Sequence, residues 1–492
     1  MICKSFKTFI FKAALYLGLF IFSFVLQDML GQNINPCPTM DSEYYQAIAQ
    51  RLNEGKGFTE SFIWQHLKKY DNLEHPTDYW MPLGSLIIAF FQRFFGMRSA
   101  IAFNYLIWSL CAVLIFRIVK KKVSGELLGF LAFLIFSSAG KFSYYLSTLD
   151  NIAYYSLFGL IFFQTLKSQK PSAVIINGIS SGLLALTRAE GVFFTAFAVL
   201  HKVFYGNIKI TILSIFCICL VFCPWLIRNQ ILLGQPFPTT QKSYFLQNYN
   251  DMFNPYSPTV AENFQKLGFT TFAKKFLRTA SIGNMEMFVI PMFLLFFPIY
   301  FLGAFKVGEK GTLFLQMFFI FILSFFFPAQ CERGTIFHLS SAFFGQMLVI
   351  SFQGIAFFLP KTFSNMNKLV FFTTFFLITS WILFFTVIGN QTSQLQNSMN
   401  FRSLSEFSKE LKAGLVPPVA SFDPIAIYLS TGFPGVVIPI PSTEDRFLNV
   451  VKEFKCRSFL WDTLYHSWDD AYAKALGWKV TASFSNLVIL KP

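Results

Sequence analysis

The sequence predicts a polytopic α-helical membrane protein with about 11 transmembrane helices and a small C-terminal extracytoplasmic α/β domain. Of its 492 residues, 54% are hydrophobic and only 13% are charged, whereas a soluble protein of this size carries more charge on its surface. Apolar runs recur that are long enough to cross a hydrocarbon layer of about 30 Å as helices. The net charge of +15 sits in short clusters at the ends of these runs. This placement is typical of cytoplasmic loops and excludes a nucleic-acid-binding surface.

The first apolar run, at about residues 8–27, predicts a retained signal anchor with its N-terminus in the cytoplasm. It follows several lysines, no A-x-A cleavage site comes after it, and it is long enough to span. The other spans are expected at about 100–119, 124–143, 150–166, 172–188, 190–205, 209–227, 285–305, 311–329, 335–359 and 368–389. The basic clusters then all face the cytoplasm: Lys4, Lys7 and Lys12; Arg117 and Lys120 to Lys122; Lys167 and Lys170; Lys202 and Lys209; Lys306 and Lys310; Lys361 and Lys368.

Three polar segments remain, and this topology places all of them outside: residues 28–98, 228–283 and 390–492. The first ends in "PLGSLIIAFFQRFFG", which predicts a helix lying in the membrane interface. The third has the strand patterns "PVASF", "GVVIPIPS", "CRSFLWD" and "SFSNLVILKP" and the helical patterns "DRFLNVVKEF" and "DDAYAKALGW". This alternation predicts a small α/β domain. Channels and carriers keep their polar machinery at mid-membrane, so polar segments above the membrane favour an enzyme acting on a lipid-borne substrate.

The first outer loop opens with "TMDSEYYQAIAQRLNEGKGF", which carries the first candidate catalytic residues, Asp41 and Glu43. Two carboxylates at this spacing can hold a divalent cation, Mg²⁺ or Mn²⁺, or supply a general base for an acceptor hydroxyl. The alternative makes Asp41 a helix N-cap and Glu43 a first-turn partner of the helix dipole. Residue chemistry alone leaves both interpretations open, and with them the need for any cofactor.

Further along the same loop, "LEHPTDYWMPLG" brings together His75, Tyr79 and Trp80. Aromatic residues at this depth form an interfacial belt in many membrane proteins. The same residues are also suited to a platform for a sugar or for the acceptor.

Four charged residues mark the outer ends of later spans: Asp150 in "STLDNIAYY", Arg188 in "LTRAEG", Arg228 after "CPWLI" and Arg333 in "CERGTIFHLS". A single outer arginine usually extends its guanidinium to the interface. Three arginines on one face of a bundle would instead suit a phosphate group, because the guanidinium binds phosphate in a bidentate manner.

In this order, "MDSEYYQAIAQRLNEGKGF", "HPTDYWMPLGSL", the second acid, "LTRAEG", "PWLIRNQILLGQPF" and a late arginine resemble the membrane glycosyltransferases of the C superfamily. The nearest kin would be bacterial relatives of the protein O-mannosyltransferases and of the aminoarabinose transferase of lipid A. The resemblance implies a polyprenyl-phosphate-linked sugar donor, a lipid, glycan or protein acceptor, and inversion at the anomeric carbon. Asp41 inherits the role of general base or metal carboxylate and Asp150 that of the second acid. Arg333, Arg228 and Arg188 match positions suited to the donor phosphate.

One departure limits the resemblance: the mannosyltransferases have adjacent Asp-Glu, and this chain has Asp-Ser-Glu at positions 41–43. Protein mannosylation is therefore not implied in particular. A lipid-linked polysaccharide ligase or polymerase and a membrane transporter remain alternative functions. The abundance of Phe, Lys and Asn suggests an AT-rich bacterial genome, so the expected location is the inner membrane, with the C-terminal domain in the periplasm.

Overall fold

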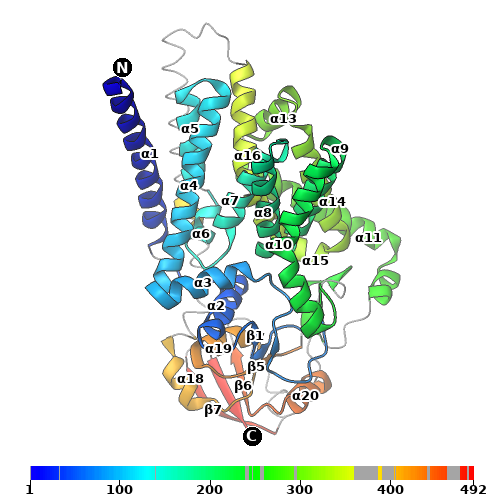
Figure 1. Cartoon of the computed structure of the whole chain (residues 1–492). Helices are drawn as coiled ribbons and strands as arrows, with labels where there is room; N and C mark the ends of the chain where they lie inside the picture. The colour runs from blue at the N-terminus through cyan, green and yellow to red at the C-terminus, as the bar shows by residue number, and fades with distance from the viewer. Residues whose placement is uncertain are drawn as a thin grey trace.

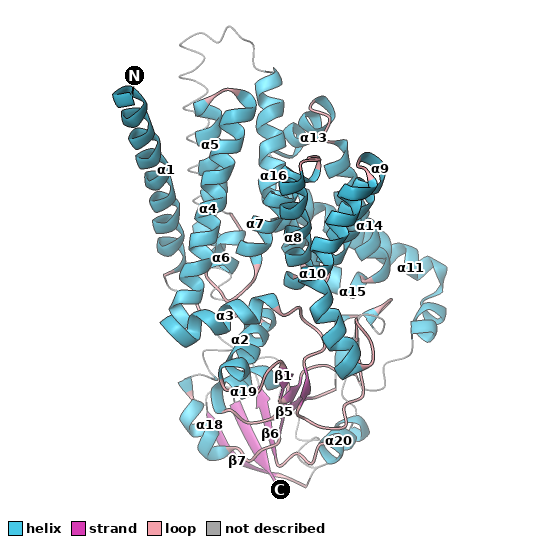
Figure 2. Cartoon of the chain, in the orientation of Figure 1, coloured by secondary structure: helices cyan, strands magenta, loops and turns pink. Residues whose placement is uncertain are grey.

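The computed structural model describes residues 2–32, 34–138, 140–238, 243–246, 248–254, 260–292, 296–358, 386–390, 404, 406–439, 444–462, 477–484 and 487–492. It consists of a helical bundle with a small mixed sheet at one end (Figures 1 and 2). The long helices are α1 (Ile2–Gly31), α4 (Met97–Val123), α10 (Ile208–Leu233) and α16 (Thr335–Phe358). Shorter helices are α5 (Glu126–Ser138), α6 (Phe142–Leu146), α7 (Ile152–Leu166), α8 (Pro171–Thr187), α9 (Gly191–Tyr205), α14 (Lys310–Phe326) and α15 (Pro328–Cys331).

Helical segments occur in each of the first ten predicted spans, but the one expected at 285–305 is bent by 95° between two helices. The eleventh, 368–389, lies outside the described residues except for its last four. Among the described helices, four are long and apolar enough to cross a membrane by themselves. A bent pair built from α11 (Val260–Asn284), a π-helical turn at Met285–Val289, α12 (Ile290–Met292) and α13 (Phe296–Lys306) raises this to at most five. The other apolar helices have 10–17 residues, fewer than the roughly 20 that a perpendicular crossing needs. The chain is an integral membrane protein, and the count of about 11 spans stays a prediction.

The core of the bundle forms where α4, α7 and α16 meet. The ring of Trp108 on α4 stacks on Phe136 of α5, with 4.2 Å between ring centroids, and Phe136 stacks on Phe344 of α16 at 5.1 Å. On α7, a Cβ at Gly159 would lie 2.1 Å from the carbonyl oxygen of Ala342, so only glycine allows α7 and α16 to approach this closely. This contact holds the start of α7 beside the start of α16.

The outer loops gather at the opposite end of the bundle from the N-terminus (Figure 1). Here lie α2 (Met40–Asn53) and α3 (Leu83–Phe95). The amide of Asn390 donates to the carbonyl oxygen of Leu30 at 3.5 Å, so the chain has returned to this end before the C-terminal segment begins. In α3 the residues Leu86, Phe90 and Phe94 are exposed, as expected for a short helix with one apolar face at the membrane interface.

The C-terminal segment contributes five strands to a six-stranded sheet, whose sixth strand, β2 (Phe62–Ile63), comes from the first outer loop; the strand order is β2-β5-β4-β6-β8-β7. Its strands are β4 (Val419–Ser421), β5 (Gly435–Val437), β6 (Ser458–Asp462), β7 (Lys479–Phe484) and β8 (Leu487–Lys491), with helices α18 (Ser408–Gly414), α19 (Pro424–Thr431) and α20 (Glu444–Glu453). All four predicted strand patterns and the first helical pattern are present. The second helical pattern, "DDAYAKALGW", lies outside the described residues except for its last two.

One strand of this sheet comes from the first outer loop. Strand β2 (Phe62–Ile63) pairs in parallel with β5, and nearby β1 (Thr59–Glu60) pairs with β3 (His75–Pro76) in a separate two-stranded sheet. The Nε2 atom of His66 lies 3.1 Å from the carbonyl oxygen of Val437 in β5. The sheet is therefore not made from the C-terminal segment alone, a feature that the expected boundary at residue 390 did not include.

Candidate functional site

The first candidate acid, Asp41, lies in the first turn of α2. The N-cap of α2 is Thr39, whose hydroxyl accepts from the backbone N–H of Ser42. The Ser42 hydroxyl in turn accepts from the backbone N–H of Thr39, which completes a capping box. Asp41 is therefore not needed as a cap, and its side chain, 27% exposed, is free to serve the site. This removes the interpretation of Asp41 as an N-cap.

Asp150 and His338 join Asp41 in one cluster, in which one potential ligand atom from each lies within 4.8 Å of the others. Asp150 comes just before α7, and His338 lies in the first turn of α16. The Nδ1 atom of His338 is 3.5 Å from the Oδ1 atom of Asp150, at the outer limit of a hydrogen bond. The other carboxylate oxygen of Asp150 has no hydrogen-bond partner in the described part of the chain.

Arg188 is the cation of this cluster. It terminates α8 as its C-cap, and its Nη1 atom lies 3.6 Å from Oδ2 of Asp41. Its Nε–H donates to Oε1 of Glu190 at 3.1 Å. One arginine thus faces three carboxylates, those of Asp41, Asp150 and Glu190, so the site carries an excess of negative charge when His338 is neutral.

Asn151 connects the elements that carry these side chains. Its amide donates to the hydroxyl of Tyr45 on α2 at 2.8 Å and to the carbonyl oxygen of Thr187, the last residue of α8, at 3.1 Å. The backbone N–H of Asn151 in turn donates to Oδ1 of Asp150 at 2.6 Å. Asn151 therefore links Asp150 to the helices that carry Asp41 and Arg188, through its backbone N–H and its side-chain amide.

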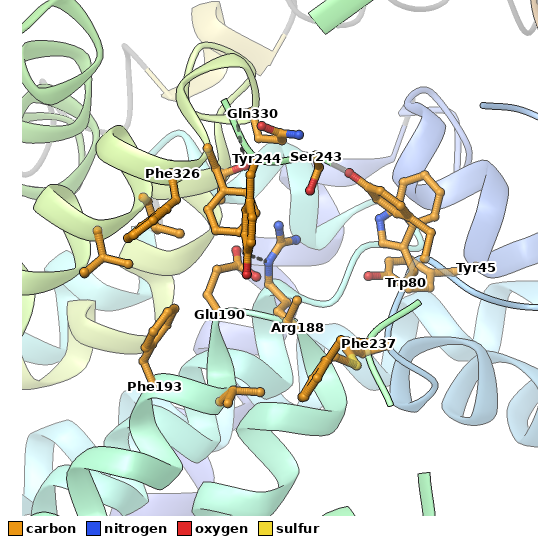
Figure 3. Close-up of a pocket in the computed structure, with 18 residues that line it drawn as sticks. Tyr45, Trp80, Arg188, Glu190, Phe193, Phe237, Ser243, Tyr244, Phe326 and Gln330 are labelled. Carbon is orange, nitrogen blue, oxygen red and sulfur yellow. Dashed lines mark hydrogen bonds and ion pairs between the residues drawn. The ribbon is translucent and has the colours of Figure 1, made fainter. Parts of the chain in front are cut away.

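A cavity of about 460 Å³ opens beside the cluster. Figure 3 shows Arg188 and Glu190 at its centre, Tyr45 and Trp80 on one side, Phe193 and Phe326 on the other, and Gln330 and Ser243 above. Most of the lining is aromatic or aliphatic, with a few polar groups that converge on the centre. This composition is typical of sites for small ligands.

Burial raises the pKa of Asp41, against the opposing effect of the positive charge of Arg188. A carboxylate with a raised pKa is a better proton acceptor once it is ionised. The charge at Asp41 is thus suited to general-base chemistry, as well as to binding a cation.

Glu43 does not reach this cluster. Two residues apart on a helix, Asp41 and Glu43 point about 200° away from each other, and Glu43 is buried against Asp423, with which it shares a side-chain hydrogen bond. Burial first, and then the charge of Asp423, raise the pKa of Glu43 well above its ordinary value. The expected metal pair of Asp41 and Glu43 is therefore not formed, and the carboxylate beside Asp41 is Asp150.

No sequence-family model matches the chain, and neither does the sequence of any curated protein. Solved structures do match. The oligosaccharyltransferase AglB from Archaeoglobus fulgidus, in complex with an inhibitory peptide and a dolichol-phosphate, superposes with a TM-score of 0.52 at 13% identity, over 92% of this chain and 70% of that one. Its apo form gives 0.52 at 12% identity over the same shares. ArnT from Cupriavidus metallidurans, bound to undecaprenyl phosphate, gives 0.47 at 9% identity over 97% of each chain.

The chain shares the fold of AglB. The resemblance expected from the motifs is thereby confirmed at the level of the fold. At these identities the match concerns architecture only, so the roles of individual residues depend on the geometry described above.

Arg228 contacts the first outer loop and not the acid cluster. Its guanidinium donates to the carbonyl oxygens of Thr77 and Phe58, each at 2.7 Å, and to Oδ1 of Asn229 at 2.8 Å. It also lies over the ring of Trp225, 4.7 Å from the centroid. These contacts join the end of α10 to the first outer loop, and they leave Arg228 few donors for a phosphate.

Arg333 is exposed, and its guanidinium lies 4.8 Å from the ring centroid of Tyr249. No carboxylate in the described part of the chain pairs with it. Tyr249 is in turn close enough to Asp41 for the charge of the Asp41 carboxylate to act on the Tyr249 hydroxyl. Arg333 thus lies at the edge of the site with its donors available.

The expected platform is only partly assembled. Tyr79 and Trp80 line the cavity and pack against each other at 4.6 Å. His75 does not line the cavity, because its ring packs against Tyr70, with 4.2 Å between ring centroids, beside the buried Glu60. Burial lowers the pKa of His75 to about 4, so it stays neutral at physiological pH.

Sequence reasoning missed His338, Asn151 and Gln330 as members of the site. The one signal for His338 was a histidine in an otherwise apolar helix, five residues after Arg333. Asn151 follows a predicted acid, but nothing in the sequence distinguishes it from an ordinary helix-start residue. Their roles come from contacts between segments that are far apart in the chain.

Proposed function

We propose that this protein is a membrane glycosyltransferase that moves a sugar from a polyprenyl-phosphate donor to an acceptor at the outer end of the bundle. The observation that carries the proposal is the meeting of Asp41, Asp150, His338 and Arg188 beside a largely apolar cavity. This arrangement, in the fold shared with AglB, offers a base, a charged site for a phosphate leaving group and an apolar environment for a lipid. The solved structure of AglB, which shares this fold, contains a dolichol-phosphate.

In the proposed reaction Asp41 takes the proton of the acceptor hydroxyl as its oxygen attacks the anomeric carbon. The bond from that carbon to the phosphate oxygen breaks with inversion, and the lipid phosphate leaves with the electron pair. Negative charge grows on the phosphate in the transition state, so nearby cations lower the barrier. Arg188 and Arg333 are the two guanidinium groups positioned for this purpose.

Charge balance supports a divalent cation, Mg²⁺ or Mn²⁺, in the acid cluster. Three carboxylates face one arginine, and an incoming phosphate adds further negative charge. Neither Oδ2 of Asp150 nor Nδ1 of His338 has a hydrogen-bond partner among the described residues, and carboxylate oxygens with an imidazole suit such an ion. Asp41, Asp150 and His338 would hold it. When bound, the ion would neutralise negative charge at the donor phosphate.

The test is transfer of labelled sugar from undecaprenyl-phosphate-linked glucose, mannose and galactose by the purified protein in lipid vesicles. Wild-type protein is expected to release undecaprenyl phosphate with at least one donor, and Asp150→Asn to lose this activity. Removal of divalent cations by EDTA is expected to lower both the activity and the melting temperature, because an ion that binds only the folded state stabilises it. Absence of transfer and of binding with every donor would refute the proposal.

The melting temperature and the activity are measured after EDTA and again after Mg²⁺ or Mn²⁺ is added back. If neither changes at either step, the proposal of a bound cation is refuted, and the proposed transfer reaction is not. In that case His338 and Arg188 remain as the neighbours of the Asp150 carboxylate.

A further inference from the structure

Gln330 presents a buried amide to the cavity. It belongs to the short helix α15 between α14 and α16, and its side chain lines the cavity near Ser243 (Figure 3). Only 9% of the residue is exposed. Its backbone carbonyl accepts from the hydroxyl of Thr335 at 3.0 Å. In the described part of the chain, however, neither Oε1 nor Nε2 of its side chain has a hydrogen-bond partner.

An unpaired amide in this position is costly. Burying a polar group without a partner costs about 1–3 kcal/mol, and most buried side-chain polar atoms in folded proteins are paired. Leucine or methionine would fill the same space without this cost. Arg188, which also lines the cavity, keeps its Nη1 atom in an ion-pair contact with Oδ2 of Asp41 at 3.6 Å. An unpaired amide that faces a cavity indicates a polar ligand.

The chemistry of the amide limits what this ligand is. A primary amide is at once a donor and an acceptor, which complements a hydroxyl group. A phosphate oxygen uses only donors, and a prenyl chain uses neither. The aromatic faces of Tyr79 and Trp80 line the same cavity and suit the apolar C–H face of a sugar ring. A cavity of about 460 Å³ lies within the range of small-ligand sites.

We propose that Gln330 recognises a hydroxyl group of the donor sugar, so that this cavity is the sugar pocket and Gln330 a specificity-determining residue. The inference rests on the proposed function and extends it. Oε1 accepts from the sugar hydroxyl, and Nε2 donates to an oxygen of the same ring. Arg188, at the centre of the cavity, lies toward the phosphate end of the donor.

The experiment compares Gln330→Leu and Gln330→Glu with wild-type protein. The probes are bare undecaprenyl phosphate and undecaprenyl-phosphate-linked glucose, mannose and galactose, with dodecyl phosphate as the reference for unspecific binding. Wild-type protein is expected to bind at least one sugar-bearing lipid more tightly than the bare lipid. Gln330→Leu should reduce that preference by about 3- to 10-fold, the usual range for one neutral hydrogen bond, and leave the affinity for bare undecaprenyl phosphate unchanged.

Gln330→Glu keeps the size and the acceptor but removes the amide donor, so it tests the same contact if the leucine variant folds poorly. A second readout needs no ligand. Without lipid, Gln330→Leu should melt at or above the wild-type temperature, because it removes an unpaired buried polar group. Gln346→Leu is the matched control: Gln346 is also a buried glutamine, but its amide oxygen accepts from Gln164 at 2.7 Å. It should melt lower and keep the sugar preference.

The outcomes separate this inference from the proposed function. If the wild type shows no preference for any sugar-bearing lipid, or if both Gln330 variants keep that preference, Gln330 does not recognise the sugar. Neither result contradicts the proposed transfer reaction. If the wild type binds no undecaprenyl lipid more tightly than dodecyl phosphate, the proposed function itself fails.

Discussion

Asp41→Asn separates catalysis from folding more cleanly than any other single change in this site. The substitution keeps the size and shape of the side chain, and it leaves the cap of α2 intact because Thr39 and Ser42 form it. The proton acceptor is lost. General-base catalysis usually contributes about 10²- to 10⁴-fold, so the transfer rate should fall by roughly 10²-fold or more.

In contrast to the loss of activity, Asp41→Asn is not expected to lower the stability of the protein. In the folded protein Asp41 lies 3.6 Å from Nη1 of Arg188, a favourable contact, but it also lies beside the carboxylates of Asp150 and Glu190, and burial raises its pKa. Removing its charge relieves repulsion and desolvation as well as attraction. We therefore expect a melting temperature close to, or slightly above, that of the wild type.

The assay is sugar transfer from an undecaprenyl-phosphate donor, with melting temperature measured on the same preparations. Glu43→Gln is the matched control, because it makes the same chemical change two residues away on the same helix but outside the acid cluster. It should keep activity within a few-fold at neutral pH. Near-normal transfer by Asp41→Asn, or an equal loss in both variants, would refute the assignment of Asp41 as the base.

Four further outcomes follow from the same contacts. Because the pKa of Asp41 is raised by burial, the transfer rate should fall as the pH drops through that raised value. Arg188→Gln removes a charge that lowers the pKa of Asp41, so in a pH–rate profile it should move the acidic limb to higher pH. Glu43 has a folded pKa above its unfolded value, so its contribution to stability is full below the unfolded pKa and is lost as the pH rises through the folded pKa. Thermal melting of Glu43→Gln should lack that part of the decline, which reaches about 1.4 kcal/mol per pH unit for one proton. Arg228→Met should lower the free energy of unfolding by about 2 kcal/mol or more, since it removes the hydrogen bonds to the carbonyl oxygens of Thr77 and Phe58 and to Oδ1 of Asn229, with donor affinity unchanged. Arg333→Ala should weaken donor binding in a lipid-binding assay, and Arg333→Lys should restore only part of it; equal affinity in all three proteins would make Arg333 an interfacial residue.

Local pattern was sufficient for many elements of the fold. Apolar run length predicted helices at ten positions where the structure has them, and strand patterns predicted four of the strands in the terminal sheet. Periodicity is a local property, so a single sequence shows it directly. Strand β2 was not predictable in this way, because two residues at the edge of a sheet carry no pattern of their own and pair with β5 from the other end of the chain.

In the candidate site, too, some features could be predicted from local sequence and others depend on contacts between distant segments. The residue types and the order of Asp41, Asp150, Arg188, Tyr79 and Trp80 along the chain were sufficient to propose them. The pairing of Asp41 with Glu43 was wrong, because spacing in sequence does not give direction once the segment is helical from Met40. Gln330 carries no local signal that separates it from ordinary residues at the end of a span, and the only signal for His338 is that it is a histidine in a largely apolar helix.

Hydrophobicity and charge act residue by residue against lipid and water, so the sequence alone predicts a membrane protein with its polar segments at one end. It also shows which acids and arginines are available there. Which of them meet depends on how the helices pack: Gly159 lets α7 approach α16 closely, Asp150 lies beside His338, and Asn151 links the start of α7 to α2 and α8. Such contacts join segments up to about three hundred residues apart, and their geometry depends on the packing of whole helices, which no short stretch of sequence specifies.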